Sequence, residues 1–181
     1  AFSAHPLKNL NALGDAGFII TDNENLYNKI KLFRNHGIQS RDYVAIFGVN
    51  SRLDSLNAEI LSFRLNKLKG IIKKRRKNIS LYRKYLKTDK VLLPSDSTNS
   101  YDSYVMMISQ CDNRDRLKSF LGSKNIQSLI YYGTPLHLHE ASKKLGYKKG
   151  DYLNAEKIAD KVLSFPHHQY LTEEEIKYVS D

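Results

Sequence analysis

One lysine in a short loop near the start of the chain has surroundings that suit nucleophilic chemistry. Residues 2–17 read FSAHPLKNLNALGDAG and contain Ser3, Pro6 and Lys8. A lysine acts as a nucleophile when its amine is held away from water or beside other cations. Pro6 fixes the backbone just before Lys8, and the Ser3 hydroxyl could donate a hydrogen bond to a phosphate. From spacing alone, a solvated surface charge is the ordinary alternative for Lys8.

The composition indicates a folded chain with a basic surface. Of 181 residues, 41% are hydrophobic, and the formal net charge is +10. Such a charge favours a partner that carries phosphate, namely a nucleic acid, an anionic membrane surface or a phosphorylated small molecule. The alternative cause is a genome-wide compositional bias, since Lys, Asn, Ile and Tyr are all abundant in this sequence. The single cysteine excludes a disulfide framework or a cysteine-rich metal site within one chain, so we expect no metal.

The chain shows no targeting or membrane-spanning pattern. It has no apolar run of spanning length and no basic region followed by an apolar one at its start. We therefore expect a soluble, cytoplasmic protein. The first residue is Ala1, which indicates a fragment or a processed chain, although removal of an initiator methionine explains it equally well.

The lysine loop must be positioned by the elements that follow it. Residues 18–21 (FIIT) are β-prone and predict a buried strand. Residues 21–37 (TDNENLYNKIKLFRNHG) predict a helix capped by Asp22 or Asn23. The apolar residues of the segment 38–52 follow no helical or strand periodicity, which predicts a loop.

A long helix is predicted over residues 53–86, and it would bridge two bodies or lie across one. Its apolar positions recur in steps of four and three and form a narrow seam, broken only by Arg75. The seam consists of Leu61, Leu65, Leu68, Ile72, Ile79, Tyr82 and Leu86. The other faces are basic and include the run Lys73–Lys77.

The pattern changes after Pro94, and residues 87–94 mark a domain boundary. The predicted elements are strands at 104–108 and 126–132, helices at 113–122 and 155–162, and a last helix opened by a capping box at Thr172–Glu175. Alternating strands and helices indicate an α/β or α+β fold.

Several motifs, in order along the chain, together resemble one family. Residues 2–21 resemble the cofactor-lysine segment of the DegT-type sugar aminotransferases, pyridoxal phosphate (PLP) enzymes of the aspartate aminotransferase fold. Further resemblances lie in KIKLFRNHGIQSRD, GVNSRLDSLNAEILSFRLNKL, IYYGTPLHLHEA and VLSFPHHQYLTEEEIKYV. Together they cover essentially the whole chain, which makes the resemblance far more specific than any one motif.

The resemblance implies roles for the cofactor residues. Lys8 matches the lysine that binds PLP as a Schiff base and then moves the proton. Ser3 matches a serine that hydrogen-bonds the PLP phosphate. Asn50 matches an asparagine that reaches the phosphate of the neighbouring subunit's cofactor. Relatives that act as dehydratases carry histidine in place of the lysine, so Lys8 favours transamination.

The resemblance implies weaker assignments elsewhere. Arg52 would serve the substrate or the subunit interface. Tyr132 and His137 match a loop of the small domain that approaches the substrate, with ordinary polar packing as the alternative. His5 and Asp15 fit the pattern, and loop stabilisation is the default role for both.

The implied fold is α/β, namely the C-terminal part of a PLP-dependent transferase. Residues 1–52 would end the large PLP-binding domain, 53–90 would form the linking helix, and 91–181 a small α+β domain. The implied enzyme is a homodimer with shared active sites that moves an amino group, with glutamate as the expected donor, to a keto group of a nucleotide-linked sugar.

Two other function classes remain open. In the family, the carboxylate for the pyridine nitrogen, the ring-stacking aromatic residue and the helix under the phosphate lie in the N-terminal half. We therefore expect this chain alone to be inactive, and a silent half-enzyme that acts as an interaction module is one alternative. The other is a nucleic-acid-binding protein that uses the basic helix at 67–87, although few aromatic residues lie among its basic ones.

Overall fold

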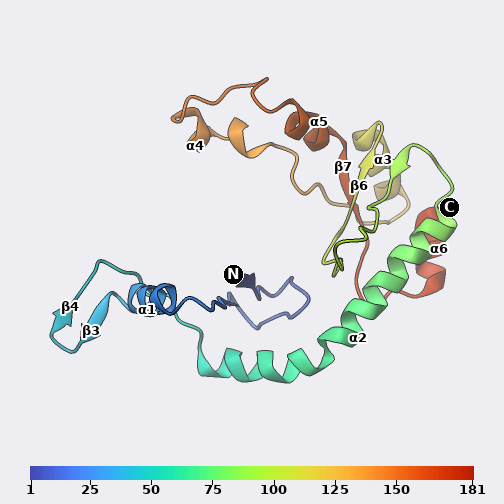
Figure 1. The fold of residues 1–181 in the computed structure, drawn as a ribbon. Coiled ribbons are helices and arrows are strands. Elements are labelled where there is room, and N and C mark those ends of the chain that lie inside the picture. The colour runs from blue at the N-terminus through green and yellow to red at the C-terminus, as the bar shows by residue number, and fades with distance from the viewer. The chain divides into compact units, whose positions relative to one another are not determined.

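The computed structural model describes residues 1–181 and divides them into two compact units, Ala1–Lys69 and Gly70–Asp181 (Figure 1). Each unit has its own apolar cluster. The first unit contains β1 (Phe2–Ser3), β2 (Gly17–Phe18), α1 (Glu24–Phe33), β3 (Ile38–Ser40), β4 (Tyr43–Val44) and the first half of α2 (Ser55–Tyr85). None of the helices combines the length and the apolar character needed to span a bilayer.

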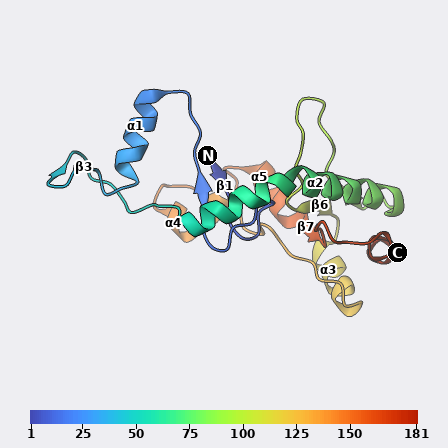
Figure 2. The same ribbon diagram turned by 90° about the horizontal axis from the view of Figure 1, so that it is seen from below.

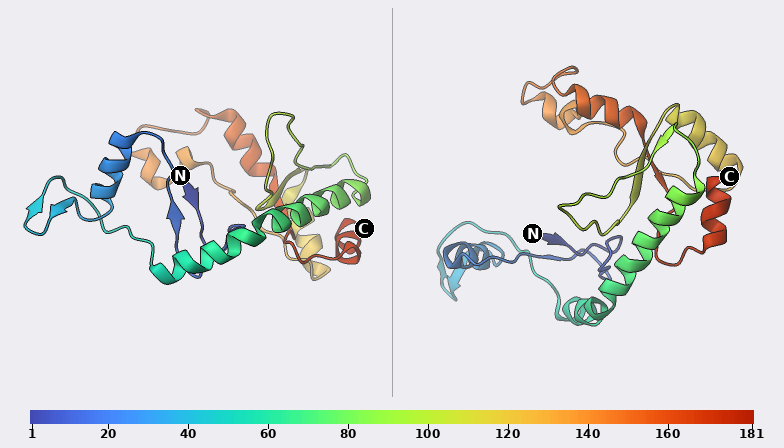
Figure 3. Two further views of the ribbon diagram at one scale, coloured as in Figure 1. Left: turned by 60° about the horizontal axis from the view of Figure 1, so that its bottom comes forward. Right: turned by 45° about the vertical axis from the view of Figure 1, so that its right-hand side comes forward.

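The lysine loop lies between the two strands of a short hairpin. β1 and β2 pair antiparallel (Figure 3, left). Phe2 lies opposite Phe18, and the two rings stack with their centroids 4.9 Å apart. The prediction of a buried strand at 18–21 is wrong, because β2 ends at Phe18 and both Ile19 and Ile20 are exposed. A strand is buried when sheet neighbours or helices cover it, and within this unit β2 pairs with β1 alone.

The predicted helix at 21–37 is α1, which leads into the β3–β4 hairpin (Figure 2). Asn23 rather than Asp22 is the cap, since its Oδ1 accepts a hydrogen bond from the Leu26 amide at 3.0 Å. The loop predicted at 38–52 therefore contains two short strands that the sequence pattern did not indicate.

Helix α2 occupies the range predicted for the long helix, but its seam is buried unevenly. Leu61 belongs to the first unit's cluster, with Ala4 and Ala12, whereas Leu65 is exposed. In the second unit, Ile79 and Tyr82 are fully buried. Arg75, which interrupts the apolar seam, is only 8% exposed and is satisfied by hydrogen bonds to acceptors on other segments.

The second unit is built on a three-stranded antiparallel sheet in the order β5–β6–β7. Its elements after α2 are β5 (Val91–Leu92), β6 (Met107–Cys111), α3 (Arg114–Ser123), η1 (Leu136–Leu138), α4 (Glu140–Lys143), α5 (Leu153–Lys161), β7 (Val162–Phe165) and α6 (Glu173–Ser180). The register places Met107 opposite Phe165 and Val91 opposite Cys111. Tyr82 of α2 packs against this sheet in the core.

Several predicted elements of this unit shift in the structure. The strand predicted at 104–108 begins at Met107, and the segment 126–132 makes only one bridge, from Leu129 to Ser164. The helix predicted at 155–162 ends at Lys161, because the chain turns directly into β7, whose four residues are all buried. The predicted capping box is confirmed, since Thr172 and Glu175 exchange both side chain-to-backbone hydrogen bonds.

Candidate functional site

The loop that carries Lys8 is held in place by backbone hydrogen bonds. The amide of Ala4 donates to the carbonyl of Ala16 at 2.8 Å, and the amide of Ala12 donates to the carbonyl of Ala4 at 2.9 Å. Lys8 itself closes a turn, because its amide donates to the carbonyl of His5 at 2.8 Å. Ala4 is fully buried at the centre of these contacts. The small side chains of Ala4 and Ala12 therefore let the loop fold closely upon itself.

Helix α2 anchors the same loop through two polar contacts. The Arg64 guanidinium donates to both the carbonyl and the side-chain oxygen of Asn11. The Leu13 amide donates to Asn57 Oδ1 at 3.1 Å. Asn11 has a φ of 59°, a left-handed conformation that asparagine tolerates better than most residues. Sequence reasoning missed these anchors, although an arginine within the apolar first half of the helix was a possible signal.

Short-range contacts from His5 shape the loop next to Lys8. His5 Nδ1 accepts from the Leu7 amide at 3.1 Å, and His5 Nε2 lies 3.8 Å from the Asp15 carboxylate. Ser3 is exposed, and its hydroxyl oxygen lies 3.5 Å from the His5 amide. Lys8 is half-buried. The His5 contacts thus help to shape the short loop that carries both Ser3 and Lys8.

Asn50 and Arg52 lie on a second segment, which packs against the end of α1. Asn50 forms an isolated β-bridge with Asn35, and Arg52 Nη2 donates to Asn35 Oδ1. Next to this bridge, the His36 amide donates to the Val49 carbonyl at 2.9 Å. Asn35 thus orders both predicted site residues, a role that the sequence motif alone did not reveal.

Two glycines allow this segment to pack closely. Gly37 has a φ of +70°, and a Cβ there would lie 1.7 Å from the carbonyl oxygen of Ile46. A Cβ on Gly48 would lie 2.5 Å from both the Gly37 nitrogen and the Phe33 oxygen. Any larger residue would therefore push the two backbones apart and displace the bridge at Asn50.

The predicted site residues thus form two groups within the first unit. Ser3 and Lys8 share the hairpin loop, whereas Asn50 and Arg52 share the Asn35 bridge. No hydrogen bond or ion pair of residues 1–69 joins the two groups.

Tyr132 and His137 belong to the second unit and differ strongly in exposure. Tyr132 is 75% exposed, whereas His137 is buried in η1. His137 Nε2 lies 3.0 Å from Glu156 Oε1, and that same oxygen accepts the Gly150 amide at 2.7 Å. The hydrogen bonds from His137 and then from Gly150 lower the pKa of Glu156. The structure therefore brings His137 together with a carboxylate that the sequence analysis had not identified.

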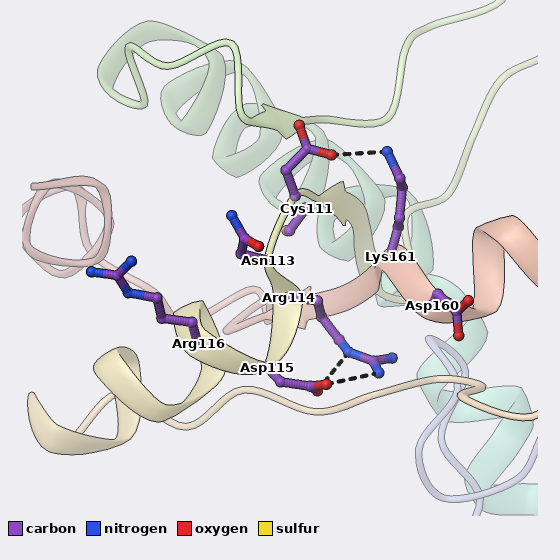
Figure 4. A pocket seen from close by; sticks show the side chains of 8 residues that line it. Cys111, Asn113, Arg114, Asp115, Arg116, Asp160 and Lys161 are labelled. Atoms are coloured by element: carbon purple, nitrogen blue, oxygen red, sulfur yellow. Dashed lines mark hydrogen bonds and ion pairs between the residues drawn. The ribbon is translucent and has the colours of Figure 1, made fainter.

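A separate depression lies where β6 meets the first turn of α3 (Figure 4). It contains none of the predicted site residues, and four of its charged side chains form two ion pairs. Lys161 donates to Asp112 at 2.8 Å, and Arg114 donates to Asp115 at 2.8 Å. Burial raises the pKa of the adjacent Cys111 thiol to about 11, so this thiol stays protonated near neutral pH. The depression therefore offers no reactive thiol nucleophile.

Comparison with known proteins gives a single family. The model of the DegT/DnrJ/EryC1/StrS aminotransferase family matches residues 1–181. A protein of Geobacillus stearothermophilus named "Pleiotropic regulatory protein" is 37% identical over 98% of this chain and 49% of its own length. An Acidithiobacillus ferrooxidans protein named as a UDP-N-acetyl-3-dehydro-α-D-glucosamine 3-aminotransferase is 32% identical over 99% of this chain and 48% of its own length.

Solved structures agree with the sequence relatives. The crystal structure of DesV from S. venezuelae superposes with a TM-score of 0.92 at 29% identity, over 99% of this chain and 50% of DesV. The chain therefore has an α/β architecture found in solved aminotransferases. It spans about half the length of the relatives and structures that it matches.

Proposed function

The chain belongs to the DegT/DnrJ/EryC1/StrS aminotransferase family, whose members depend on PLP, and from this we propose that it forms the C-terminal part of a nucleotide-sugar aminotransferase. The enzyme would move an amino group from an amino acid, glutamate in our proposal, to a keto group of a nucleotide-linked sugar. The observation that carries the proposal is the ordered loop that holds Lys8 and Ser3 within the motif of this family.

The donor groups of this loop fit PLP. The cofactor has an aldehyde, which a primary amine can attack, and a phosphate, which hydroxyl groups and amides bind. When bound, it supplies an electron-withdrawing ring that stabilises negative charge on the substrate carbon. Lys8 provides the amine, and Ser3 provides an exposed hydroxyl five residues earlier. We assign Lys8 and Ser3 to hold the cofactor.

In this proposal Lys8 acts first as nucleophile and later as general base and acid. Its Nζ must be neutral to attack a carbonyl carbon, and once released it can take a proton from the substrate and return it to another atom. Both steps need the amine in a fixed place. The turn at His5 and the Arg64–Asn11 contact restrict the loop and so limit the entropy lost in reaching that position.

We propose that two copies of the protein share their active sites. Asn50 would reach the cofactor phosphate of the partner, and Arg52 would face the substrate or the interface between subunits. Support comes from the bridge at Asn35, which orders both residues at a surface where Val49 and Phe47 are exposed. Tyr132 and His137 would approach the sugar from the second unit.

We further propose the domain limits expected from the sequence, with the end of the large domain at 1–52, the linking helix at 53–90 and the small domain at 91–181. The basic run on α2 fits this structural role. Arg75 is buried, and Arg76 donates to the Asp102 carbonyl at 2.8 Å, so two of the five basic side chains in 73–77 serve internal contacts. This observation weakens the nucleic-acid alternative.

The proposal can be tested by following the glutamate half-reaction, in which PLP is converted to pyridoxamine phosphate. A form of the protein with the length of its relatives should carry out this conversion. Lys8→Ala should abolish it, whereas Lys74→Ala, which removes an exposed lysine, should leave it unchanged. Borohydride reduction should label Lys8, and label spread over the lysines of α2 would contradict the assignment. The 181-residue chain alone should be silent, and conversion by it that depends on Lys8 would show that this half is self-sufficient.

A further inference from the structure

The carboxylate of Glu156 joins three separate segments of the second unit. Its Oε1 lies 3.0 Å from His137 Nε2 in η1 and accepts the Gly150 amide at 2.7 Å, while Glu156 itself belongs to α5. The side chains of His137 and Glu156 are only 7% and 13% exposed. Two polar groups buried to this extent are stable only when they are paired, so the contact fixes the geometry of all three segments.

Two tyrosine rings restrict the His137 ring further. The Tyr152 ring lies 4.9 Å from the imidazole centroid, tilted by 60°, and Tyr147 packs edge-on against Tyr152 at 5.8 Å. Of the charged groups nearby, Asp151 is turned towards its own loop, because its Oδ2 accepts the Lys148 amide. Glu156 is therefore the charged group that contacts the imidazole.

This geometry determines which imidazole nitrogen carries the proton. An ionised carboxylate only accepts hydrogen bonds, and the low pKa of Glu156 keeps it ionised near neutral pH. Whenever the His137 ring is neutral, it must then hold its proton on Nε2. The hydrogen bond to Glu156 uses Nε2, so in this tautomer Nδ1 is an acceptor. A neutral acceptor of this kind suits a hydroxyl donor.

We propose that Glu156 is the positioning residue of the loop at 131–139: it fixes the His137 ring with the proton on Nε2 and leaves Nδ1 to accept a hydrogen bond from a hydroxyl of the substrate. The sugar as the source of that hydroxyl rests on the proposed function. The fixed tautomer does not, because it follows from the contacts within the second unit.

The tautomer can be measured directly by nitrogen NMR of the histidine side chains in the 181-residue chain, at a pH where the spectrum shows the His137 ring to be neutral. We expect His137 to show one tautomer, protonated on Nε2. Glu156→Ala should give a mixture of both tautomers, and Glu156→Gln, which retains an acceptor oxygen, should restore much of the Nε2–H form. Glu140→Gln is the matched control, because Glu140 is an exposed carboxylate paired only with Lys143. An Nδ1–H tautomer in the unchanged chain, which needs no variant to fold, would overturn the inference, as would an unaltered tautomer in Glu156→Ala.

The consequence for the substrate is tested at the length of the relatives, with UDP-N-acetyl-3-dehydro-α-D-glucosamine as the probe. Glu156→Ala should lower kcat/KM for this sugar roughly tenfold or more, because a misplaced ring loses its contact with the hydroxyl. The glutamate half-reaction should keep its rate, since glutamate presents no sugar hydroxyl. An unchanged kcat/KM for the sugar would overturn the inference. If the unchanged enzyme converts neither substrate, the proposed function fails, whereas the tautomer measurement still decides the role of Glu156.

Discussion

Arg75→Met should destabilise the second unit, because one guanidinium supplies hydrogen bonds to four acceptors. Its Nη1 donates to the carbonyls of Val105, Tyr104 and His167 at 2.8, 3.2 and 3.4 Å. Its Nε and Nη2 donate to Gln169 Oε1 at 3.2 and 2.9 Å. No carboxylate takes part, so the positive charge is held by dipoles alone. The side chain therefore connects the segment before β6 and the segment after β7 to α2.

The size of the effect follows from the groups that would lose their donors. Methionine fills most of the volume but donates nothing, and a buried acceptor without a donor costs about 1–3 kcal/mol. Two of the five hydrogen bonds, to the Val105 carbonyl and from Nη2 to Gln169, are short enough for their acceptors to bear this full cost. Water can replace the donor at some of the others. Burial lowers the pKa of Arg75, which shows that holding the charge here has a cost that methionine removes. The balance is a loss of about 2–4 kcal/mol.

Thermal unfolding followed by circular dichroism can measure this loss. The melting temperature of Arg75→Met should fall on the order of 10 °C. Lys74→Met is the matched control, because Lys74 is the exposed neighbour on the same helix, and its change should stay within about 0.5 kcal/mol. Equal melting temperatures for the two variants would refute the reasoning and show that the guanidinium contacts contribute nothing net.

Two further predictions concern acid stability and the dimer. Burial, and then the charge of Arg75, lower the pKa of His167 from 6.5 to about 4. As the pH falls, His167 therefore takes up a proton in the unfolded chain before it does so in the folded one. Between pH 6.5 and about pH 4 the second unit should lose roughly 3 kcal/mol of its free energy of unfolding. Urea unfolding at several pH values should show this loss, and His167→Gln should flatten the profile; parallel profiles would contradict it. At the length of the relatives, Asn50→Ala subunits mixed with Lys8→Ala subunits should recover part of the activity, because one of the two sites then keeps both residues. Mixed dimers without recovery would place Asn50 outside the partner's site.

The sequence predicts elements well where local chemistry is sufficient. The helix at α1 and the capping box at Thr172 are both set by side chains within a few residues, and both are observed. Strand limits are less well predicted, because pairing partners decide them. β7 follows α5 without a break, so nothing in its own four residues separates it from the helix, and its burial comes from pairing with β6.

Long-range polar contacts are the part of the site that sequence reasoning could not find. Arg64 and Asn11 are 53 residues apart, and His137 and Glu156 are 19 apart, with no repeat or spacing rule to connect them. The motifs indicated Lys8 because its neighbours in sequence are also its neighbours in space. Glu156 contacts a residue that is distant in sequence, so only the folded structure identifies its role.

The contact between Gly37 and Gly48 also affects how this region can vary during evolution. The atoms that would obstruct a side chain at either position are mainly backbone atoms of Ile46, Phe33 and Gly37 itself. A clash with a side chain can be relieved by a second mutation that shortens that side chain, but no mutation shortens a peptide group. Changes at positions 37 and 48 thus have no simple suppressor, whereas side chains in the exposed turn at Arg41 and Asp42 meet no such backbone obstruction.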